Sequence, residues 1–482
     1  MESAPFCRVP AEARGDGVPY PARVAGPLPI HFPGRAGQWA SLAITDALCA
    51  KTRLPFLLLD LAVAWILFAR TTSLAAGLES DPRIIAASAV FAPTLVLTTL
   101  GMGLYDRIRR YDWENIIRGS LIGTALAALA VMWCFGSVLP GAVSLNGAMT
   151  AWLGVAALHL VPAALLKNYS YRFTILGSSA YMEEVKAFCR RAPQGWRLYS
   201  HVPWDRLRAN HFQPTAEKLQ AAGIGELVLA KEAMDEVGQF ELALGFLPLN
   251  CRVVDEAAFY VGMFERLPLD AIDKGWLLEH GLARRQLVTT AVKRALDVLL
   301  AGVAIVALSP LLALIAVAIK VSSRGPILFV QTRQGQHLVP FTMYKFRTMY
   351  AHRGSAEAEG GFTRNNDGRV TPVGRLVRRF HLDELPQLWN VLRGEMSLVG
   401  PRPEVLSFAE RIRRSVPLYE LRYIARPGLT GYAQINQGYA MDSVVDTKRK
   451  LSYDLYYLCN HNLWSDLSIM IRTLFVLARG AR

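Results

Sequence analysis

The sequence predicts a membrane protein that combines α and α/β architecture. It has a four-helix transmembrane bundle, a cytosolic α/β domain with a parallel sheet, and a C-terminal domain with a membrane helix broken at Ser309-Pro310. The first observation is composition: 52% of the 482 residues are hydrophobic and only 19% are charged, whereas soluble domains carry about 25% charged residues. The second is a succession of long apolar stretches, and the third is a later alternation of short strand and helix patterns.

The charge balance narrows the class of partner. Lys and Arg number 53 against 39 Asp and Glu, which gives a net charge of +14. Such an excess suits nucleic acid, an anionic membrane face or a phosphorylated substrate, and the hydrophobicity favours the last two. The six cysteines include no C-x-x-C pair, which excludes a zinc ribbon and argues against a disulfide framework.

The N-terminal half divides into an arm and a bundle. Residues 1–50 are rich in Pro and Gly and lack the pattern of a signal peptide, so we expect a loose arm. Four apolar stretches follow within residues 51–168, each near the ~20 residues that cross a bilayer; they are residues 54–69, 84–104, 116–139 and 149–166.

Flanking charges orient this bundle. Cations precede the first stretch, lie between the second and third, and follow the fourth, as in Lys51, Arg109 and Lys167. The positive-inside rule therefore places both ends of the bundle in the cytoplasm.

Residues 169–285 alternate between strand and helix patterns. We expect strands at 172–176, 196–202, 226–230 and 251–255, with helices at 182–191, 216–222 and 236–246. This alternation predicts a Rossmann-like parallel sheet. The first turn, at residues 177–180, lacks the G-x-G-x-x-G glycines that admit a pyrophosphate. A degenerate nucleotide-binding module and a structural or dimerising module both remain open, and the missing glycines favour the second.

A fifth apolar run, residues 296–319, is interrupted by Ser309-Pro310. Proline lacks an N–H and collides with the carbonyl four residues earlier, that of Val306, so the helix is expected to kink or break. The Ser309 hydroxyl is the expected partner of the freed carbonyl. Cations flank both ends of the run, which predicts a re-entrant helix over residues 293–320 that enters and leaves on the cytoplasmic side; an ordinary kinked span is the alternative.

Arginines gather between residues 324 and 426, where sixteen occur. The block carries no recognisable nucleic-acid-binding motif and follows membrane segments, so nucleic acid is not expected as a partner. Within it, Asp383 and Glu384 precede Pro386, which is tolerated in the first turn of a helix. We expect that helix to begin near Glu384, with Asp383 at or near the N-cap and ionised beside Arg378 and Arg379.

This local setting supports two interpretations. An ionised Asp383 can act as a nucleophile toward phosphorus, with Glu384 left to bind a metal, and Mg²⁺ fits one or two carboxylates plus substrate phosphates. Alternatively, Asp383 is an ordinary helix cap and Glu384 an ordinary first-turn charge. Composition alone leaves both open.

From about residue 293 onward the chain resembles the bacterial sugar transferase family, the monotopic phosphoglycosyl transferases. The resemblance rests on the Ser-Pro-broken helix, K-F-R-T-M at 345–349, L-D-E-L-P-Q at 382–387, G-P-R-P at 400–403 and P-G-L-T-G at 427–431. The preceding bundle and sheet resemble the long form of that family. His381 departs from the Ser or Thr that many members carry there. Residues 286–482 are then the catalytic domain.

The resemblance implies an enzyme that transfers hexose-1-phosphate, most commonly glucose-1-phosphate, from a UDP-sugar to undecaprenyl phosphate and releases UMP. Asp383 is implied as the nucleophile that carries the phosphosugar, and Glu384 as the Mg²⁺ ligand. Arg378 and Arg402 are implied to bind substrate phosphates, a role that we extend to Lys345 and Arg347. The implied location is the bacterial inner membrane with the active site on its cytoplasmic face, and the product would begin a repeat unit of exopolysaccharide, capsule or O-antigen.

Other classes fit less well. A CDP-alcohol transferase requires D-G-x₂-A-R, and Asp367-Gly368 is followed by a different sequence. A polytopic sugar-phosphate transferase needs many more spans. A non-catalytic scaffold of polysaccharide assembly is the remaining alternative, and loss of the Asp383-Glu384 pair would be its signature. Whether the chain forms a homodimer stays open.

Overall fold

The computed structural model describes most of the chain from Leu54 onward. The residues outside the description are 1–53, 77–80, 103–112, 136–140, 167–170, 178, 192–195, 204–223, 225, 232–251, 273, 278–286, 351–367, 438–442 and 479–482. The expected N-terminal arm and the helices expected at 216–222 and 236–246 lie outside it.

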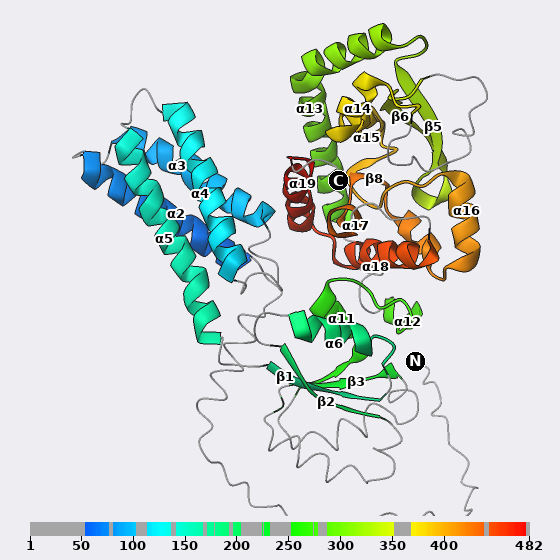
Figure 1. Ribbon diagram of the computed structural model, residues 1–482, viewed down its shortest axis with the longest axis horizontal. Coiled ribbons are helices and arrows are strands. Elements are labelled where there is room, and N and C mark those ends of the chain that lie inside the picture. Colours follow the sequence, from blue (N-terminus) through cyan, green and yellow to red (C-terminus); the bar gives the residue numbers. More distant parts are fainter. Residues whose placement is uncertain are drawn as a thin grey trace, which may run out of the picture. The chain divides into compact units, whose positions relative to one another are not determined.

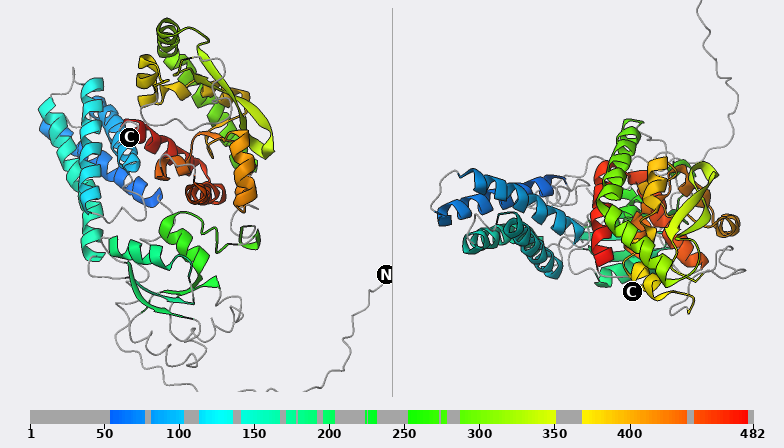
Figure 2. Two further views of the ribbon diagram at one scale, coloured as in Figure 1. Left: turned by 45° about the vertical axis from the view of Figure 1, so that its right-hand side comes forward. Right: turned by 90° about the horizontal axis from the view of Figure 1, so that it is seen from above.

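The four apolar stretches form a bundle of helices (Figure 1). They are α2 (Leu54–Ala76), α3 (Pro82–Gly101), α4 (Trp113–Phe135) and α5 (Gly141–Leu166). Helices α2 and α4 each pack against both α3 and α5, and two further views show the four side by side (Figure 2). The bundle predicted between residues 51 and 168 is therefore present.

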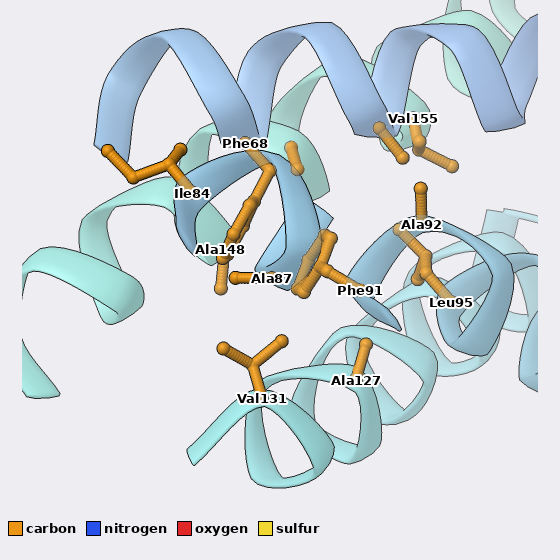
Figure 3. Packing of buried hydrophobic residues seen from close by; sticks show 12 residues of the cluster. Phe68, Ile84, Ala87, Phe91, Ala92, Leu95, Ala127, Val131, Ala148 and Val155 are labelled. Carbon is orange, nitrogen blue, oxygen red and sulfur yellow. The ribbon is translucent and has the colours of Figure 1, made fainter. Parts of the chain in front are cut away.

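Aromatic and small side chains fill the centre of this bundle (Figure 3). The rings of Phe68 and Phe91 stack with their centroids 4.3 Å apart. Alanines such as Ala127 and Ala148 let neighbouring helices approach closely. The outer face is apolar instead of polar: the side chain of Trp133 is 92% exposed, as suits a lipid-facing surface.

Four helical stretches in the described part of the chain are long and apolar enough to cross a membrane: Leu57–Ala76, Pro82–Gly101, Ile116–Phe135 and Thr290–Ser322. The described apolar part of α5, Leu145–Val161, is shorter. Together they make this a membrane protein.

The next region holds a four-stranded sheet of β1 (Tyr171–Leu176), β2 (Trp196–Val202), β3 (Glu226–Leu229) and β4 (Arg252–Asp255). The strand order is β2-β1-β3-β4 and every pair is parallel, as predicted. Helices α6 (Met182–Arg191) and α11 (Glu256–Phe264) lie on one face of it (Figure 1).

A carboxylate of the chain itself lies at the carboxyl ends of the central strands β1 and β3. Glu256 accepts a hydrogen bond from the Ser179 hydroxyl, after β1, and one of 3.3 Å from the backbone N–H of Lys231, after β3. In open parallel sheets this edge is where a nucleotide phosphate binds. An internal anion at that place favours the structural interpretation of the domain.

The run around Ser309-Pro310 is a single helix, α13 (Leu287–Ser322), which corrects the predicted break. The helix contains Pro310, and Figure 1 shows it bending along its length. The Ser309 hydroxyl donates a hydrogen bond of 2.8 Å to the carbonyl of Val306, as the sequence predicts. Because this carbonyl is partly satisfied by the side chain, the helix bends and continues.

The cations at the start of α13 have partners inside the domain. Lys293 pairs with Asp466 at 2.6 Å. Arg294 donates to the carbonyls of Val391 and Leu392 at 2.6 and 2.9 Å. These two charges anchor α13 to the folded domain, so they are weaker signals of membrane topology than the sequence alone suggested.

The remaining elements build the C-terminal domain. Strands β5 (Leu328–Gln334) and β6 (Pro340–Phe346) form an antiparallel hairpin, and β7 (Ser397–Val399) pairs in parallel with β8 (Gly428–Thr430). The helices are α12 (Lys274–Leu277), η3 (Gln336–Leu338), α14 (Pro372–Arg379), η5 (Leu382–Glu384), α15 (Gln387–Arg393), α16 (Leu406–Ser415), η6 (Tyr419–Ile424), α17 (Tyr432–Gln437), α18 (Val444–Asn460) and α19 (Leu463–Ala478).

Candidate active site

Three separate elements bring charges together around Glu384. Lys345 comes from β6, Glu384 from the 3₁₀ turn η5, and Arg402 from the loop after β7. Lys345 Nζ lies 3.0 Å from Glu384 Oε1, and Arg402 binds with both nitrogens, Nη2 to Oε1 at 2.6 Å and Nη1 to Oε2 at 3.2 Å. The structure thus joins three of the residues predicted from sequence.

The electrostatics of this trio follow from burial and contact. Burial alone would raise the pKa of Glu384, but Arg402 and Lys345 outweigh it and hold that pKa well below its usual range. Burial lowers the pKa of Lys345, with Glu384 opposing it. Glu384 is therefore a fixed anion.

Asp383 has a different environment from the one predicted. It lies within η5, whose backbone closes through i+3 hydrogen bonds such as Leu385 N–H to Leu382 O. The following helix, α15, begins only at Gln387, with Pro386 as its N-cap residue. Asp383 is therefore not at the N-cap of α15, because the chain adds a 3₁₀ turn before that helix.

The pKa of Asp383 is raised, first by burial and then by the neighbouring Glu384, while Lys345 and Arg378 oppose the rise. The sequence predicted the opposite direction, because it assumed an N-cap and neighbouring arginines without burial. A buried carboxylate with a raised pKa is more basic and less solvated than a surface one. Both properties make it a stronger nucleophile once ionised.

Arg378 reaches this region from the last turn of α14. Its Nε donates a hydrogen bond of 2.7 Å to the Thr348 hydroxyl. Thr371 caps the start of α14 through the N–H of Gly374 at 2.9 Å. A Cβ on Gly374 would lie 2.0 Å from the carbonyl oxygen of Thr348, so glycine is required for α14 to lie against the backbone at Thr348. Arg378 is thereby held beside Asp383.

The guanidinium of Arg347 lies away from the Glu384 cluster in which we expected it. Its side chain is 6% exposed. The guanidinium donates to the carbonyls of Ser323 and Arg324 at 2.9 and 3.2 Å and to the Ser323 hydroxyl at 2.9 Å. Arg347 therefore fastens the chain after α13 to the hairpin.

Two motif glycines position Arg402. The N–H of Gly400 donates to Thr430 O and that of Gly428 to Pro401 O, each at 2.9 Å. A Cβ on Gly428 would lie 2.1 Å from the backbone nitrogen of Gly400. Only glycine permits this approach, and it fixes the loop from which Arg402 extends.

A second charged cluster lies behind Arg402, and we did not predict it. Arg422 of η6 pairs with Asp454 of α18 at 2.8 Å and donates to the carbonyl of Arg402 at 2.9 Å. Glu404 accepts from Lys450 and lies 3.5 Å from Arg422. Glu404 follows the G-P-R-P motif directly, which was the available signal; Asp454 and Lys450 lie in a helical pattern and gave none.

The donor set suits Mg²⁺ in kind. Asp383 and Glu384 offer adjacent carboxylates, and Mg²⁺ takes one or two of these together with substrate phosphate oxygens. The described residues contain no group of three His, Cys, Asp or Glu side chains that could hold a metal by themselves. A metal here would therefore depend on substrate for its remaining ligands.

Comparison with known proteins agrees with this site. The family model described as "Bacterial sugar transferase" matches residues 288–480. A UDP-glucose:undecaprenyl-phosphate glucose-1-phosphate transferase of Caulobacter vibrioides is 45% identical over 185 residues, 38% of this chain and 67% of that protein. The chain belongs to the bacterial sugar transferase family.

Other relatives differ in the sugar that their names carry. A UDP-N-acetylgalactosamine-undecaprenyl-phosphate N-acetylgalactosaminephosphotransferase of Aeromonas hydrophila is 43% identical over 39% of this chain and 44% of its own length. An undecaprenyl-phosphate galactose phosphotransferase of Salmonella typhimurium is 34% identical over 48% of this chain and 50% of its own length. The match thus spans about half the length of these two relatives.

Proposed function

We propose that this protein transfers hexose-1-phosphate from a UDP-sugar to undecaprenyl phosphate, with glucose as the first candidate, and so begins a repeat unit of exopolysaccharide, capsule or O-antigen. The observation that carries the proposal is the buried Asp383 beside the Glu384–Lys345–Arg402 cluster. Family membership and the names of the relatives support the reaction class. Their different sugars leave the choice of hexose to experiment.

In the proposed mechanism Asp383 attacks the β-phosphorus of the UDP-sugar. An oxygen of Asp383 bonds to that phosphorus, the bond to the bridging oxygen breaks, and UMP leaves with the electron pair. The phosphate of undecaprenyl phosphate then attacks the same phosphorus and releases Asp383. A covalent intermediate divides a displacement between two large anions into two steps.

The charged neighbours have separate tasks in this mechanism. Lys345, Arg378 and Arg402 neutralise and orient the substrate phosphates, as guanidinium and ammonium groups do elsewhere. Glu384 holds Lys345 and Arg402 in place and is the proposed protein ligand of Mg²⁺. A bound Mg²⁺ would supply further stabilisation of phosphate charge.

The covalent step can be tested directly. Detergent-purified protein is mixed with UDP-glucose and Mg²⁺ in the absence of any polyprenyl phosphate. We expect a stoichiometric burst of UMP and labelled sugar phosphate on Asp383. UMP that forms only when both substrates are present, with no adduct trapped, would instead mean direct transfer. A burst with UDP-galactose and none with UDP-glucose would change the sugar and keep the chemistry.

We also propose that α13 enters and leaves the membrane on its cytoplasmic side, which places the active site in the cytoplasm. The bend of α13, a helix that contains Pro310, supports this arrangement. In a cysteine-free background, Arg324→Cys and Arg375→Cys are expected to be shielded from an impermeant thiol reagent in intact cells, whereas Asp81→Cys reacts. Labelling of the cysteines at both 324 and 375 from outside the cell would mean that α13 spans the membrane. Pro310→Ala is expected to lower activity more than expression.

A further inference from the structure

The charged groups around the active site do not balance. Among the residues that the structure describes, the six cations of this region are Arg333, Lys345, Arg378, Arg402, Arg422 and Lys450, and the four carboxylates are Asp383, Glu384, Glu404 and Asp454. Two positive charges are therefore in excess even with every carboxylate ionised. Partly desolvated charge without a partner is costly, so an excess of this kind indicates a site for an anionic ligand.

The excess can be traced to two arginines. Lys345 and Arg402 share Glu384, whereas among the described residues neither Arg333 nor Arg378 lies within ion-pair distance of a carboxylate. Arg378 uses its Nε on the Thr348 hydroxyl, a neutral group. Arg378 acts electrostatically on Asp383, which places it on the side of the nucleophile.

Arg333 lies on strand β5, and the charged groups that act on it are Glu404, Arg402 and Glu384. Its Nη2 donates to the Gln331 side chain at 2.7 Å and its Nη1 to the carbonyl of Pro403 at 3.4 Å, both neutral acceptors. Its Nε is buried and makes no hydrogen bond within the described part of the chain. Burial lowers the pKa of Arg333 to about 10, with Glu404 opposing and Arg402 adding to the fall. A guanidinium is thus held beside the site with donor capacity to spare.

We propose that Arg333 binds the phosphate that leaves in the first half-reaction, the phosphate of the nucleoside monophosphate. The inference rests on the proposed function. Arg378 beside Asp383 then faces the phosphoryl group that is transferred, and Arg333 faces the group across the breaking bond. The two uncompensated cations match the two phosphates of a nucleoside diphosphate sugar.

The same geometry assigns Arg333 a role in the second half-reaction. Displacement at phosphorus is in line, with the attacking and leaving oxygens on opposite sides. The acceptor phosphate must therefore approach Asp383's adduct from the side by which the nucleotide phosphate departed. Arg333 binds a phosphate monoester in both steps, first as product and then as nucleophile.

The contribution of Arg333 to strand pairing comes from its backbone, whereas phosphate binding would use its guanidinium. The backbone of Arg333 forms a bridge with Val405, and any side chain preserves that contact. Within the described residues, the guanidinium adds the hydrogen bonds to Gln331 and Pro403 and no others. Substitution of the side chain therefore separates phosphate binding from strand pairing.

The test measures binding of UMP and of uridine to the detergent-purified full-length protein by calorimetry. Arg333→Gln is expected to weaken UMP binding about tenfold to a hundredfold, the range for loss of a charge-assisted hydrogen bond, and to leave uridine binding unchanged. Arg333→Lys keeps the positive charge but not the planar set of donors of a guanidinium. We expect this variant to lose less UMP affinity than Arg333→Gln. Arg414→Gln, an exposed arginine of α16, is the matched control and is expected to bind as wild type. Thermal unfolding of each variant verifies folding.

Kinetics separate this inference from the proposed function. In wild-type protein the UMP burst tests the reaction itself, and its absence would overturn both. With the burst present, Arg333→Lys is expected to slow both UMP release and the acceptor-dependent step. Equal UMP affinity in wild type and Arg333→Lys, together with unchanged rates of both steps, would overturn the role of Arg333 alone. A loss confined to thermal stability would also overturn it.

Discussion

The four-helix bundle and the C-terminal domain both bury polar groups, but they treat them differently. In the bundle, two pairs of polar side chains meet across neighbouring helices: Asp60 of α2 lies 2.8 Å from His159 of α5, and Thr150 of α5 donates to Thr71 of α2 at 3.0 Å. In the described part of the C-terminal domain, the cluster keeps two cations, Arg333 and Arg378, that lie outside ion-pair distance of a carboxylate.

The comparison separates scaffold from site. Satisfied polar pairs within a membrane bundle fix which helices pack together. An unbalanced cluster gains little as scaffold, because desolvated charge without a partner destabilises the folded protein. The same imbalance favours binding of a ligand of opposite charge. Uncompensated charge of this kind concentrates at functional sites. We expect substitutions in the two regions to affect activity and stability in opposite proportions.

The largest effect is expected for Asp383→Asn. Removing the nucleophile is expected to lower sugar-phosphate transfer on the order of a thousandfold or more, measured as UMP release. Because the folded protein raises the pKa of Asp383, ionising it costs stability at neutral pH. The variant is therefore expected to unfold at an equal or higher temperature than wild type. Near-normal turnover would remove Asp383 from the mechanism.

Glu384→Gln is expected to be the next most damaging change. The variant keeps the size of the side chain but leaves Lys345 and Arg402 without their shared anion. We expect activity to fall about a hundredfold, with partial recovery when Mg²⁺ is raised, since weaker metal binding is overcome by mass action. Glu410→Gln, on the exposed side of α16, is the control. No response to Mg²⁺ would restrict Glu384 to holding the two cations.

Sequence reasoning predicted the elements better than the contacts. The spans and parallel strands follow local periodicity, and the predicted strand at 196–202 coincides with β2. Lys345, Glu384 and Arg402 were recognised because each lies in a compact motif. Arg347 was expected in the same cluster because it shares a motif with Lys345, but its guanidinium lies on Ser323 and Arg324 instead. Residues i and i+2 of a strand, as Lys345 and Arg347 are, point to the same face only while the strand continues. Strand β6 ends at Phe346, so spacing alone could not tell where Arg347 would reach.

The Asp383 environment shows a second limit. The pKa of Asp383 depends on burial by segments that are distant in sequence. No local sequence pattern indicates this burial. Asp454 was missed for the same reason: its partner Arg422 comes from η6, and only the fold brings the two together.

Acid stability is expected to depend on Glu404. Burial would raise the pKa of this carboxyl, but Lys450 and Arg422 outweigh it and lower the pKa from 4.5 to about 2. Its contribution is therefore present above pH 4.5 and is lost as pH falls toward 2, and at neutral pH it is about 3 kcal/mol. Thermal unfolding of wild type and Glu404→Gln is compared at pH 7, 4.5 and 3. The two are expected to differ most at pH 7 and to converge on acidification; a constant difference would contradict the assignment.

The smallest effect is expected for the Asp60–His159 pair, and it probes the scaffold side of the comparison. Both side chains are buried between α2 and α5. Asp60→Ala, His159→Ala and the double variant form a cycle whose coupling free energy is expected to be about 1 kcal/mol, the scale of polar contacts between membrane helices. It is measured by unfolding in detergent, while UMP release by the purified protein is followed in parallel. Each single variant is expected to lose stability and to keep the burst, because the pair belongs to helix packing and the reacting groups lie in the C-terminal domain. A coupling near zero would mean that the pair does not hold α2 to α5. Loss of the burst without loss of stability would place these two residues in the catalytic cycle and break the separation of scaffold from site.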